Sequence, residues 1–418
     1  ADLAIVFRYF DEDQQYEVFS LMKNNEHTLE FLTELDDLFI ANLLKIENTE
    51  RIANLIQNAS TNEQSYILGA LNNDQAESVI NKLKSEEKEE IEEIMAYPED
   101  SAGALMATDI FTLHKSTTCR EALKTLQDRK EAEMVFYIYI TDDDDSLVGI
   151  ASLRALATTN PEIKLKEIMV KNVHKVRPET DQEEVAQIVA QYNYLAVPVV
   201  DADNILLGIV TVDDVVDVIR EEATEDFLQM AGAGKDREIL LKSSWENAKI
   251  RIPWLLASWF GGIIASYVIG NFEEMLKNII VLASFIPIII GMGGNIGTQS
   301  STIIVRGMAT GRITIGNELS IILKELKAGL ILGVLYGLML GLFAGFRFID
   351  TNPIIGFVVG LSICSSMIIA TGVGAFIPIA LRKLDIDPAI ATGPFVTTSI
   401  DILGVFLYFL IAELLLQV

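Results

Sequence analysis

Cysteine and histidine are scarce in this sequence. Two cysteines and three histidines occur in 418 residues. Cys119 and Cys364 are too few and too far apart to indicate a disulfide framework or a zinc site, and they fit a reducing compartment. His27, His114 and His174 all precede the long apolar segments. The apolar half therefore lacks the side chain that most often serves as a catalytic base.

Positive charge is also in short supply. The chain carries 59 acidic and 32 basic side chains, for a net charge of −27. Residues 251–418 contain nine of each sign, so the whole excess lies in residues 1–250. We expect no nucleic-acid partner, since phosphates require a basic surface. The acidity indicates either a solvated surface or an affinity for cations.

The C-terminal part consists of long apolar runs. Each run is near the length of about 20 residues that spans hydrocarbon as a helix. We expect five spans, at residues 252–270, 276–305, 318–346, 353–381 and 389–415. Residues 1–10 have neither a basic start nor a long apolar stretch, so we expect no signal peptide and an N-terminus inside the cell.

Basic residues predict the orientation of these spans. Positive side chains concentrate at cytoplasmic ends. Those that flank the spans on one side are Lys249, Arg251, Arg306, Arg312, Lys324, Lys327, Arg382 and Lys383, against Lys277 and Arg347 on the other. The soluble domains should therefore be cytoplasmic and the C-terminus outside.

Residues 1–104 are expected to form a helical, superhelical N-terminal domain. Short apolar patterns recur there, as at residues 40–44 and 52–56, between polar breaks that contain Asn, Ser and Thr. Such patterns are typical of stacked short helices that bury one face each.

Residues 105–212 contain a duplication with a period of about 60 residues. Residues 147–150 recur as residues 206–209 with nearly the same sequence. In each copy a helical stretch precedes a β-rich run (residues 135–141 and 196–200), and an Asp-containing turn and a Gly-Ile strand follow. The pattern resembles a tandem pair of α/β cystathionine β-synthase-type (CBS) domains.

The CBS resemblance implies a cleft for ATP or another adenine nucleotide. The turn after Ile150 lacks a phosphate-cradling glycine signature. A purely structural or metal-responsive pair is therefore the alternative.

An acidic connecting (plug) helix is expected over residues 213–250. Seven carboxylates fall within fourteen residues: Asp213, Asp214, Asp217, Glu221, Glu222, Glu225 and Asp226. On a helix several of them share a face and repel one another, which cations would relieve. Hard divalent cations prefer oxygen ligands, although a solvated acidic helix shows the same pattern.

The transmembrane domain, residues 251–418, contains two motifs unlike ordinary apolar sequence. The first is the glycine-rich run at residues 291–300, in which Asn295 and Gln299 are one helical turn apart. A glycine and proline cluster can free carbonyls to line an aqueous path, while close helix packing would also explain it.

The second motif begins at Asp387-Pro388 and ends with Asp401. A charged side chain deep in a span is costly unless it faces water or a partner. Thr397 lies one turn before Asp401, on the same face. Structure or assembly could explain a lone aspartate, but a substrate path explains it better.

The order of these parts resembles the MgtE magnesium channel family. The specific motifs are Gly-Gly-Asn-x-Gly-x-Gln and Pro-x-x-Thr-Thr-x-x-Asp, and the likeness covers essentially the whole chain. It implies a homodimer in the bacterial inner membrane with the pore on its symmetry axis. Asp401 of both subunits would form the ion site, with Thr397 one turn away and Asn295 and Thr298 near the entrance.

The resemblance also implies a cytosolic Mg2+ sensor that closes the pore. Its matching positions are Asp214, Asp217, Glu222, Glu225 and Asp226, with Asp100 and the Gly103 backbone added. Mg2+ is the implied ion, and Mn2+, Co2+ and Ca2+ are candidates for the same path.

Two other functions fit parts of the sequence. An ion-coupled secondary transporter of divalent cations could also use Asp401, but the inverted repeats typical of that class are not apparent in five spans. A nucleotide-regulated membrane enzyme would need a nucleophile and base or a metal cluster within the spans. We therefore expect that the protein is not an enzyme.

Overall fold

The fold comes from a computed structural model that describes residues 2–57, 59–128, 136–235, 239, 241–313, 316–350, 352–384 and 386–417. The chain forms two compact units, Ala1–Arg220 and Glu221–Val418. Among the described residues, the first unit contains most of the short helices and the five strands, and the second contains the long apolar helices.

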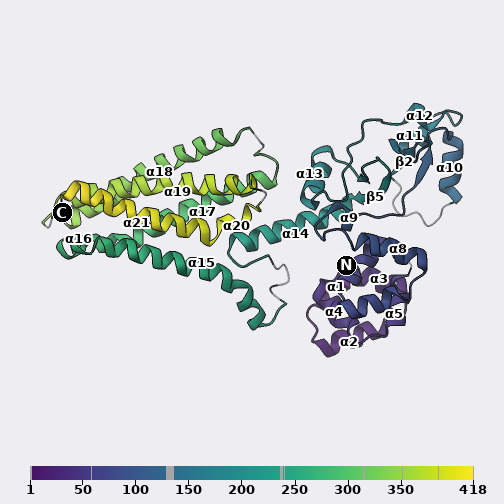
Figure 1. Ribbon diagram of the computed structural model, residues 1–418, viewed down its shortest axis with the longest axis horizontal. Helices are drawn as coiled ribbons and strands as arrows, with labels where there is room; N and C mark the ends of the chain where they lie inside the picture. Colours follow the sequence, from purple (N-terminus) through teal and green to yellow (C-terminus); the bar gives the residue numbers. More distant parts are fainter. Residues whose placement is uncertain are drawn as a thin grey trace. The chain divides into compact units, whose positions relative to one another are not determined.

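Short helices build the beginning of the first unit (Figure 1). They are α1 (Asp2–Phe7), α2 (Glu12–Leu21), α3 (Asn25–Thr33), α4 (Asp37–Leu44), α5 (Thr49–Ile56), α6 (Thr61–Gly69), α7 (Asn73–Ile80) and α8 (Ser85–Ile94). Polar residues start them: Asp11 and Ser60, for example, form capping boxes with Gln14 and Glu63. One shared apolar core runs through them, as the short apolar repeats predicted.

The CBS pair follows the order predicted for each copy. The first copy contains α9 (Ala102–Leu105), β1 (Thr112–His114), α10 (Cys119–Asp128), β2 (Tyr137–Thr141), β3 (Leu147–Ser152), α11 (Leu153–Thr158) and α12 (Leu165–Ile168). The second contains α13 (Gln182–Tyr192), β4 (Ala196–Val200), β5 (Leu206–Thr211) and the start of α14 (Val212–Met230). Val135, the first residue of one predicted run, lies outside the described residues.

Each copy has its own small sheet. Strand β1 pairs parallel with β2, which pairs antiparallel with β3, while β4 and β5 form an antiparallel pair. The two copies touch at their Asp-containing turns, where the Ser146 hydroxyl donates to the Asp203 carbonyl at 3.1 Å and the Asn204 amide donates to the Leu147 carbonyl at 2.8 Å. These bonds join the equivalent turns of the duplication.

Five helices in the described part of the second unit are long and apolar enough to cross a membrane. They are α15 (Ser244–Asn271), η1 with α17 (Ile280–Phe285 and Ile286–Ala309), α18 (Glu318–Arg347), α19 (Ile355–Arg382) and α21 (Pro394–Leu416), with the short helices α16 (Glu273–Asn278) and α20 (Ala389–Thr392) between them. Figure 1 shows α17, α18, α19 and α21 side by side, with α15 beside α21. The prediction of five spans is confirmed.

Three boundaries differ from the sequence prediction. Helix α15 begins at Ser244, well before the apolar run, because Ser243 and Glu246 form a capping box. The last span is interrupted at Gly393, where α20 ends and Pro394 starts α21 without an amide hydrogen to donate. The segment 213–250 is not one helix, since α14 ends at Met230 and Gly232 and Gly234 follow with φ of 69° and 94°.

Glycines bring α18 and α19 into close contact. A side chain at Gly337 would place its Cβ 2.5 Å from the Gly360 carbonyl oxygen, and one at Gly341 would lie 2.8 Å from the Gly356 oxygen. Small residues at such positions let helix backbones approach in a membrane. Of this close pair, α19 packs against α20 and α21, the helices that carry the second motif.

Candidate ion path and acidic helix

The glycine-rich motif lies on α17 and packs against α21 and α19. A Cβ at Gly297 would lie 2.0 Å from Cδ1 of Ile400, and one at Gly374 would lie 2.3 Å from the Gly297 carbonyl oxygen. A Cβ at Gly291 would meet nothing within 4 Å. Close packing therefore explains part of this motif and leaves the rest unexplained.

Gly294 of the same motif lies beside Asp401. A Cβ built at Gly294 would stand 3.7 Å from Oδ1 of Asp401, so the bare glycine leaves space at the carboxylate. Asp401 is half-buried on α21. Within the described part of the chain its carboxylate accepts no hydrogen bond and pairs with no cation. A charged group inside a span is costly unless it faces water, an ion or a polar partner.

Further polar side chains lie on α17 and α21 near Gly294 and Asp401 in the chain. Asn295 and Gln299 are exposed one turn apart on α17, as their spacing predicted. The hydroxyl of Thr298 donates to the Gly294 carbonyl at 2.9 Å, and that of Thr397 donates to the Gly393 carbonyl at 3.2 Å. With their hydrogens used inside the helix, these hydroxyl oxygens keep lone pairs for water or a hydrated cation. We call Asn295, Thr298, Gln299, Thr397 and Asp401 the polar seam.

The acidic helix α14 has a half-buried carboxylate in its first turn, Asp214. Asp214 Oδ1 accepts from the Asn62 amide at 3.4 Å, and Oδ2 accepts from the backbone and hydroxyl of Thr211. Burial, reinforced by neighbouring Asp213 and Asp217, raises the pKa of Asp214 to about 6. The Asn62 contact ties α6 of the N-terminal domain to α14, and sequence spacing gave no sign of it.

The next predicted sensor positions are more open. Asp217 is exposed and contacts the Arg220 guanidinium one turn away at 3.3 Å, while Glu222 is half-buried. Asp214 and Asp217 lie three residues apart on one face of helix α14, as predicted. Like charges at that spacing destabilise a helix until a cation neutralises them.

The end of α14 belongs to the second unit and contacts the start of α20. The fully buried Gln229 donates its amide to Glu225 at 2.9 Å and to Asp387 at 2.8 Å. The Lys235 ammonium lies 2.9 Å from Glu225 and 3.7 Å from Asp387. We call Glu225, Asp226, Gln229, Lys235 and Asp387 the latch. Asp387 begins the second sequence motif, but no sequence pattern predicts its contact with Gln229 of α14.

Asp226 is the third carboxylate of the latch. Burial, together with the charges of Asp387 and Glu225, raises its pKa to about 6, although Arg306 and Lys235 oppose the shift. The latch thus holds three carboxylates, with the Lys235 ammonium and the Arg306 guanidinium as the nearby cations. A cation that joined this group would strengthen the contact between α14 and α20.

Asp100 and Gly103 contact the second CBS copy. The backbone and side chain of Asp100 both accept from Gln182, and the Gly103 amide donates to the Pro178 carbonyl at 2.8 Å. A Cβ at Gly103 would lie 2.5 Å from the Tyr97 ring, so the glycine is needed for packing. These contacts join the start of the first CBS copy to the second copy. A metal role for Asp100 and Gly103 stays a prediction.

No group of three or more His, Cys, Asp or Glu side chains arranged to hold a metal occurs among the described residues.

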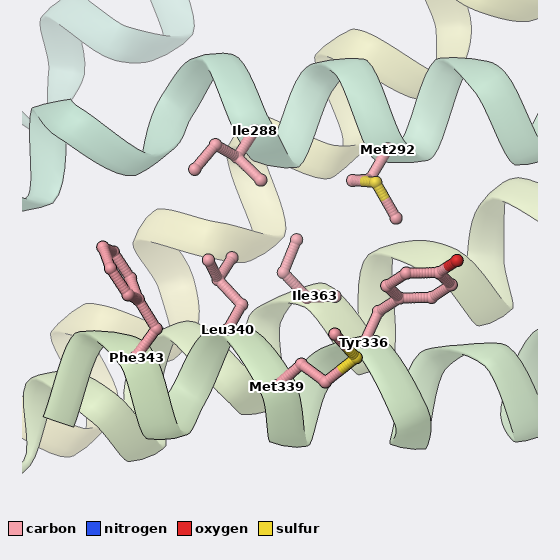
Figure 2. A pocket seen from close by; sticks show the side chains of 7 residues that line it. All are labelled: Ile288, Met292, Tyr336, Met339, Leu340, Phe343 and Ile363. Atoms are coloured by element: carbon pink, nitrogen blue, oxygen red, sulfur yellow. The ribbon is translucent and has the colours of Figure 1, made fainter. Parts of the chain in front are cut away.

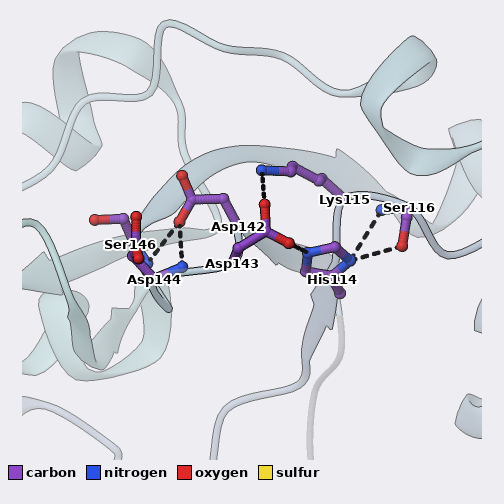
Figure 3. Close-up of polar contacts among 7 residues, drawn as sticks. All are labelled: His114, Lys115, Ser116, Asp142, Asp143, Asp144 and Ser146. Atoms are coloured by element: carbon purple, nitrogen blue, oxygen red, sulfur yellow. Dashed lines mark hydrogen bonds and ion pairs between the residues drawn. The ribbon is translucent and has the colours of Figure 1, made fainter.

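The acidic turn of the first CBS copy is occupied by its own contacts (Figure 3). Asp142 Oδ1 accepts from the backbone amides of Asp144 and Ser146. Asp143 contacts Lys115 at 2.8 Å and the His114 ring at 3.1 Å, and the bond from Lys115 lowers the pKa of Asp143. These contacts fix the turn, and an adenine nucleotide at the CBS pair stays a prediction.

The fold and the two polar groups define a class: a polytopic membrane protein with a CBS pair joined to the apolar spans by an acidic helix. Family comparison agrees in every part. The divalent cation transporter model MgtE matches residues 286–411, the MgtE intracellular N domain matches residues 1–100, and CBS domains match residues 102–159 and 165–221.

Curated relatives make the assignment specific. The chain is 34% identical to the magnesium transporter MgtE of Bacillus subtilis over 98% of this chain and 90% of that protein. It is 37% identical to the magnesium transporter MgtE of Thermus thermophilus over 78% of this chain and 73% of that protein. Among solved structures, the cytosolic domain of the Mg2+ channel MgtE in complex with ATP aligns at 31% identity with a TM-score of 0.40, covering 52% of this chain and 93% of that one. The chain belongs to the MgtE magnesium transporter family.

Proposed function

We propose that this chain is a homodimeric channel for Mg2+ influx across the bacterial inner membrane, closed from the cytosol by Mg2+ itself. The observation that carries this proposal is the polar seam. A carboxylate, two carboxamides and two hydroxyls follow one line along α17 and α21, inside helices apolar enough to span a bilayer.

A second copy of the chain makes the seam tolerable in a membrane. Exposed amides and a half-buried carboxylate cost several kcal/mol against lipid, by order of magnitude. A two-fold axis beside α17 and α21 would bring the seam against its own copy, since a two-fold interface joins the same patch on both subunits. The path between them would be polar and wet, with Asp401 of each subunit at its centre.

Such a path suits a hydrated divalent cation. Two carboxylates match the charge of one Mg2+, which gives up its waters reluctantly. The space beside Gly294 lets water remain between the ion and Asp401. Selection would then depend on the size and charge of the hydrated ion, with Mn2+, Co2+ and Ca2+ as the competitors to test.

Closure would act through α14. Mg2+ bound at Asp214, Asp217 and Glu222, and at Glu225 and Asp226 of the latch, neutralises the repulsion along the helix. The ion stabilises whichever state it binds more tightly, so closure requires tighter binding in the closed state. The soluble domains face the cytosol and the C-terminus lies outside in this arrangement.

Single-channel recording on reconstituted protein tests the proposal. With Mg2+ as the only permeant cation, its concentration on the side of the soluble domains is stepped from micromolar to about 10 mM, where weak oxygen sites fill. We expect discrete openings that disappear as Mg2+ rises. Uptake without resolvable openings would instead establish a coupled transporter.

The sensor has a separate test. Neutralising Asp214, Asp217 and Glu225 together should leave the channel open at high Mg2+ while its conductance stays normal. Unchanged inhibition in this variant would refute the assignment of α14 as the sensor. Cross-linking of cysteines placed at the ends of α21 measures the expected dimer independently.

A further inference from the structure

A groove opens between the start of α18 and the end of α19. Its volume is about 440 Å3, and its apolar lining residues are Leu319, Ile322, Phe376, Ile379, Ala380 and Leu384. Glu318 and Lys383 complete the lining. We call these eight residues the basic groove. Leu319, Phe376 and Leu384 are 70%, 60% and 68% exposed, so most of the wall contacts whatever surrounds the helices.

Three basic side chains lie at the mouth of the groove or next to it in the chain. The Lys383 ammonium lies 3.4 Å from Glu318, whose other oxygen accepts from the Gly316 amide, and the lysine side chain is still 65% exposed. Arg382 donates to the carbonyl of Ile313, the residue after exposed Arg312. Lys383, Arg382 and Arg312 thus place three basic side chains at this end, where Glu318 is paired with Lys383. Asp387, which follows in the same loop, belongs to the latch. Asp385 lies outside the described residues.

From this geometry we infer that the basic groove binds one anionic phospholipid of the phosphatidylglycerol type. An acyl chain fills the apolar walls, and the phosphate lies against Lys383 with Arg312 and Arg382 around it. Basic pockets between spans at a membrane surface recognise anionic head groups, each cation contributing attraction near the surface. The inference requires that α18 and α19 cross a bilayer, and it does not depend on which ion the protein conducts.

A second lipid-facing hollow provides an internal control. This apolar notch, of about 250 Å3, is lined by Ile288, Met292, Tyr336, Met339, Leu340, Phe343 and Ile363 (Figure 2). It lies between α17, α18 and α19 and has no charged lining residue. Phe343 is 59% exposed, nearly the same as Phe376 in the basic groove. An acyl chain can fill the notch, but nothing there distinguishes one head group from another.

Tryptophan reporters compare the two hollows in the full chain. Phe376→Trp and Phe343→Trp are each reconstituted with brominated phosphatidylglycerol or brominated phosphatidylcholine of matched chains. Quenching of the parent protein, which has three native tryptophans, is subtracted. We expect the Phe376→Trp reporter to prefer the anionic lipid about fivefold or more, about the effect of one cation at a membrane surface. The Phe343→Trp reporter should show a ratio near one.

Charge substitution then tests the head-group contacts. Adding Lys383→Gln and Arg312→Gln to the Phe376→Trp reporter should bring its lipid ratio to about one, whereas Lys277→Gln, at an exposed cation on α16, should leave it unchanged. If the double variant does not fold, raising the salt concentration on the unsubstituted reporter must reduce the preference.

Several results would overturn the inference. They are equal quenching by both lipids at Phe376→Trp, a preference that survives the double substitution or high salt, and quenching by neither lipid because a second copy covers the groove. Mg2+ flux measured in the same vesicles reports the proposed channel separately, so the two proposals can fail independently.

Discussion

Gly297→Ala tests whether close packing at the glycine-rich motif positions the helix that carries Asp401. The added Cβ would lie 2.0 Å from Cδ1 of Ile400, the residue before Asp401. Overpacking of this kind costs about 1–3 kcal/mol, and it must displace either Ile400 or α17. For a unit of this size each kcal/mol corresponds to about 2–4 °C in melting temperature. We expect a loss of about 2–12 °C relative to the control below, with reduced Mg2+ flux.

Gly291→Ala is the matched control on the same helix. Its Cβ meets nothing within 4 Å, so it receives the same gain in helix propensity without the clash. Gly374→Ala should be more damaging than either, because its Cβ would lie 2.3 Å from a backbone oxygen that no rotamer change can move. Thermal unfolding and fluorescent Mg2+ uptake are measured for all three. Equal behaviour of Gly297→Ala and Gly291→Ala would refute this account of the packing.

Three further outcomes are expected. Asp401→Asn should abolish Mg2+ uptake while light scattering still shows a dimer; normal flux would remove Asp401 from the ion path. Asp387→Asn should raise the Mg2+ concentration that half-closes the channel, since the latch loses a carboxylate, and an unchanged value in stepped recordings would exclude it from gating. Acidification from pH 7.5 to 5.5 should raise the half-closing Mg2+ concentration about fourfold for each carboxylate with a pKa of about 6. Asp214 and Asp226 are mostly protonated at pH 5.5, and Mg2+ must displace these protons to bind. Half-closure that is independent of pH would contradict this linkage.

The sequence predicted the architecture well where the signal was long or repeated. Five apolar runs predicted five spans, and the duplicated Gly-Ile strands predicted the two CBS sheets, because each pattern extends over many residues. Ends were less predictable. Helix α15 extends past the apolar run through a polar cap, and the last span breaks at Gly393, since capping and proline geometry act within single residues.

Contacts between distant residues were not predictable in the same way. Helical spacing placed Asn295 and Gln299 on one face, but no spacing rule brings Gly294 to Asp401 from another helix. Asp387 and Gln229 are 158 residues apart, and Asn62 and Asp214 are 152 apart. Without a fold, the acidic helix showed only that its charges repel.

The two halves of α14 contact different units, and this division bears on the gating proposal. Asp214 is held by Asn62 in the first unit, whereas Glu225 shares Gln229 and Lys235 with Asp387 in the second. In the latch the Lys235 ammonium already offsets part of the negative charge, so the contact between α14 and α20 can persist without a bound ion. In the first half of the helix, burial and the charges of Asp213 and Asp217 raise the pKa of Asp214, and the exposed Asp217 contacts the Arg220 guanidinium. Helix α14 is continuous from Val212 to Met230. Neutralising the carboxylates in its first half therefore stabilises the same helix whose last turn contacts Asp387 through the latch. Mg2+ would therefore act most strongly at Asp214 and Asp217, and Lys235→Gln should make the latch depend on Mg2+ as well, giving a steeper closure in stepped recordings.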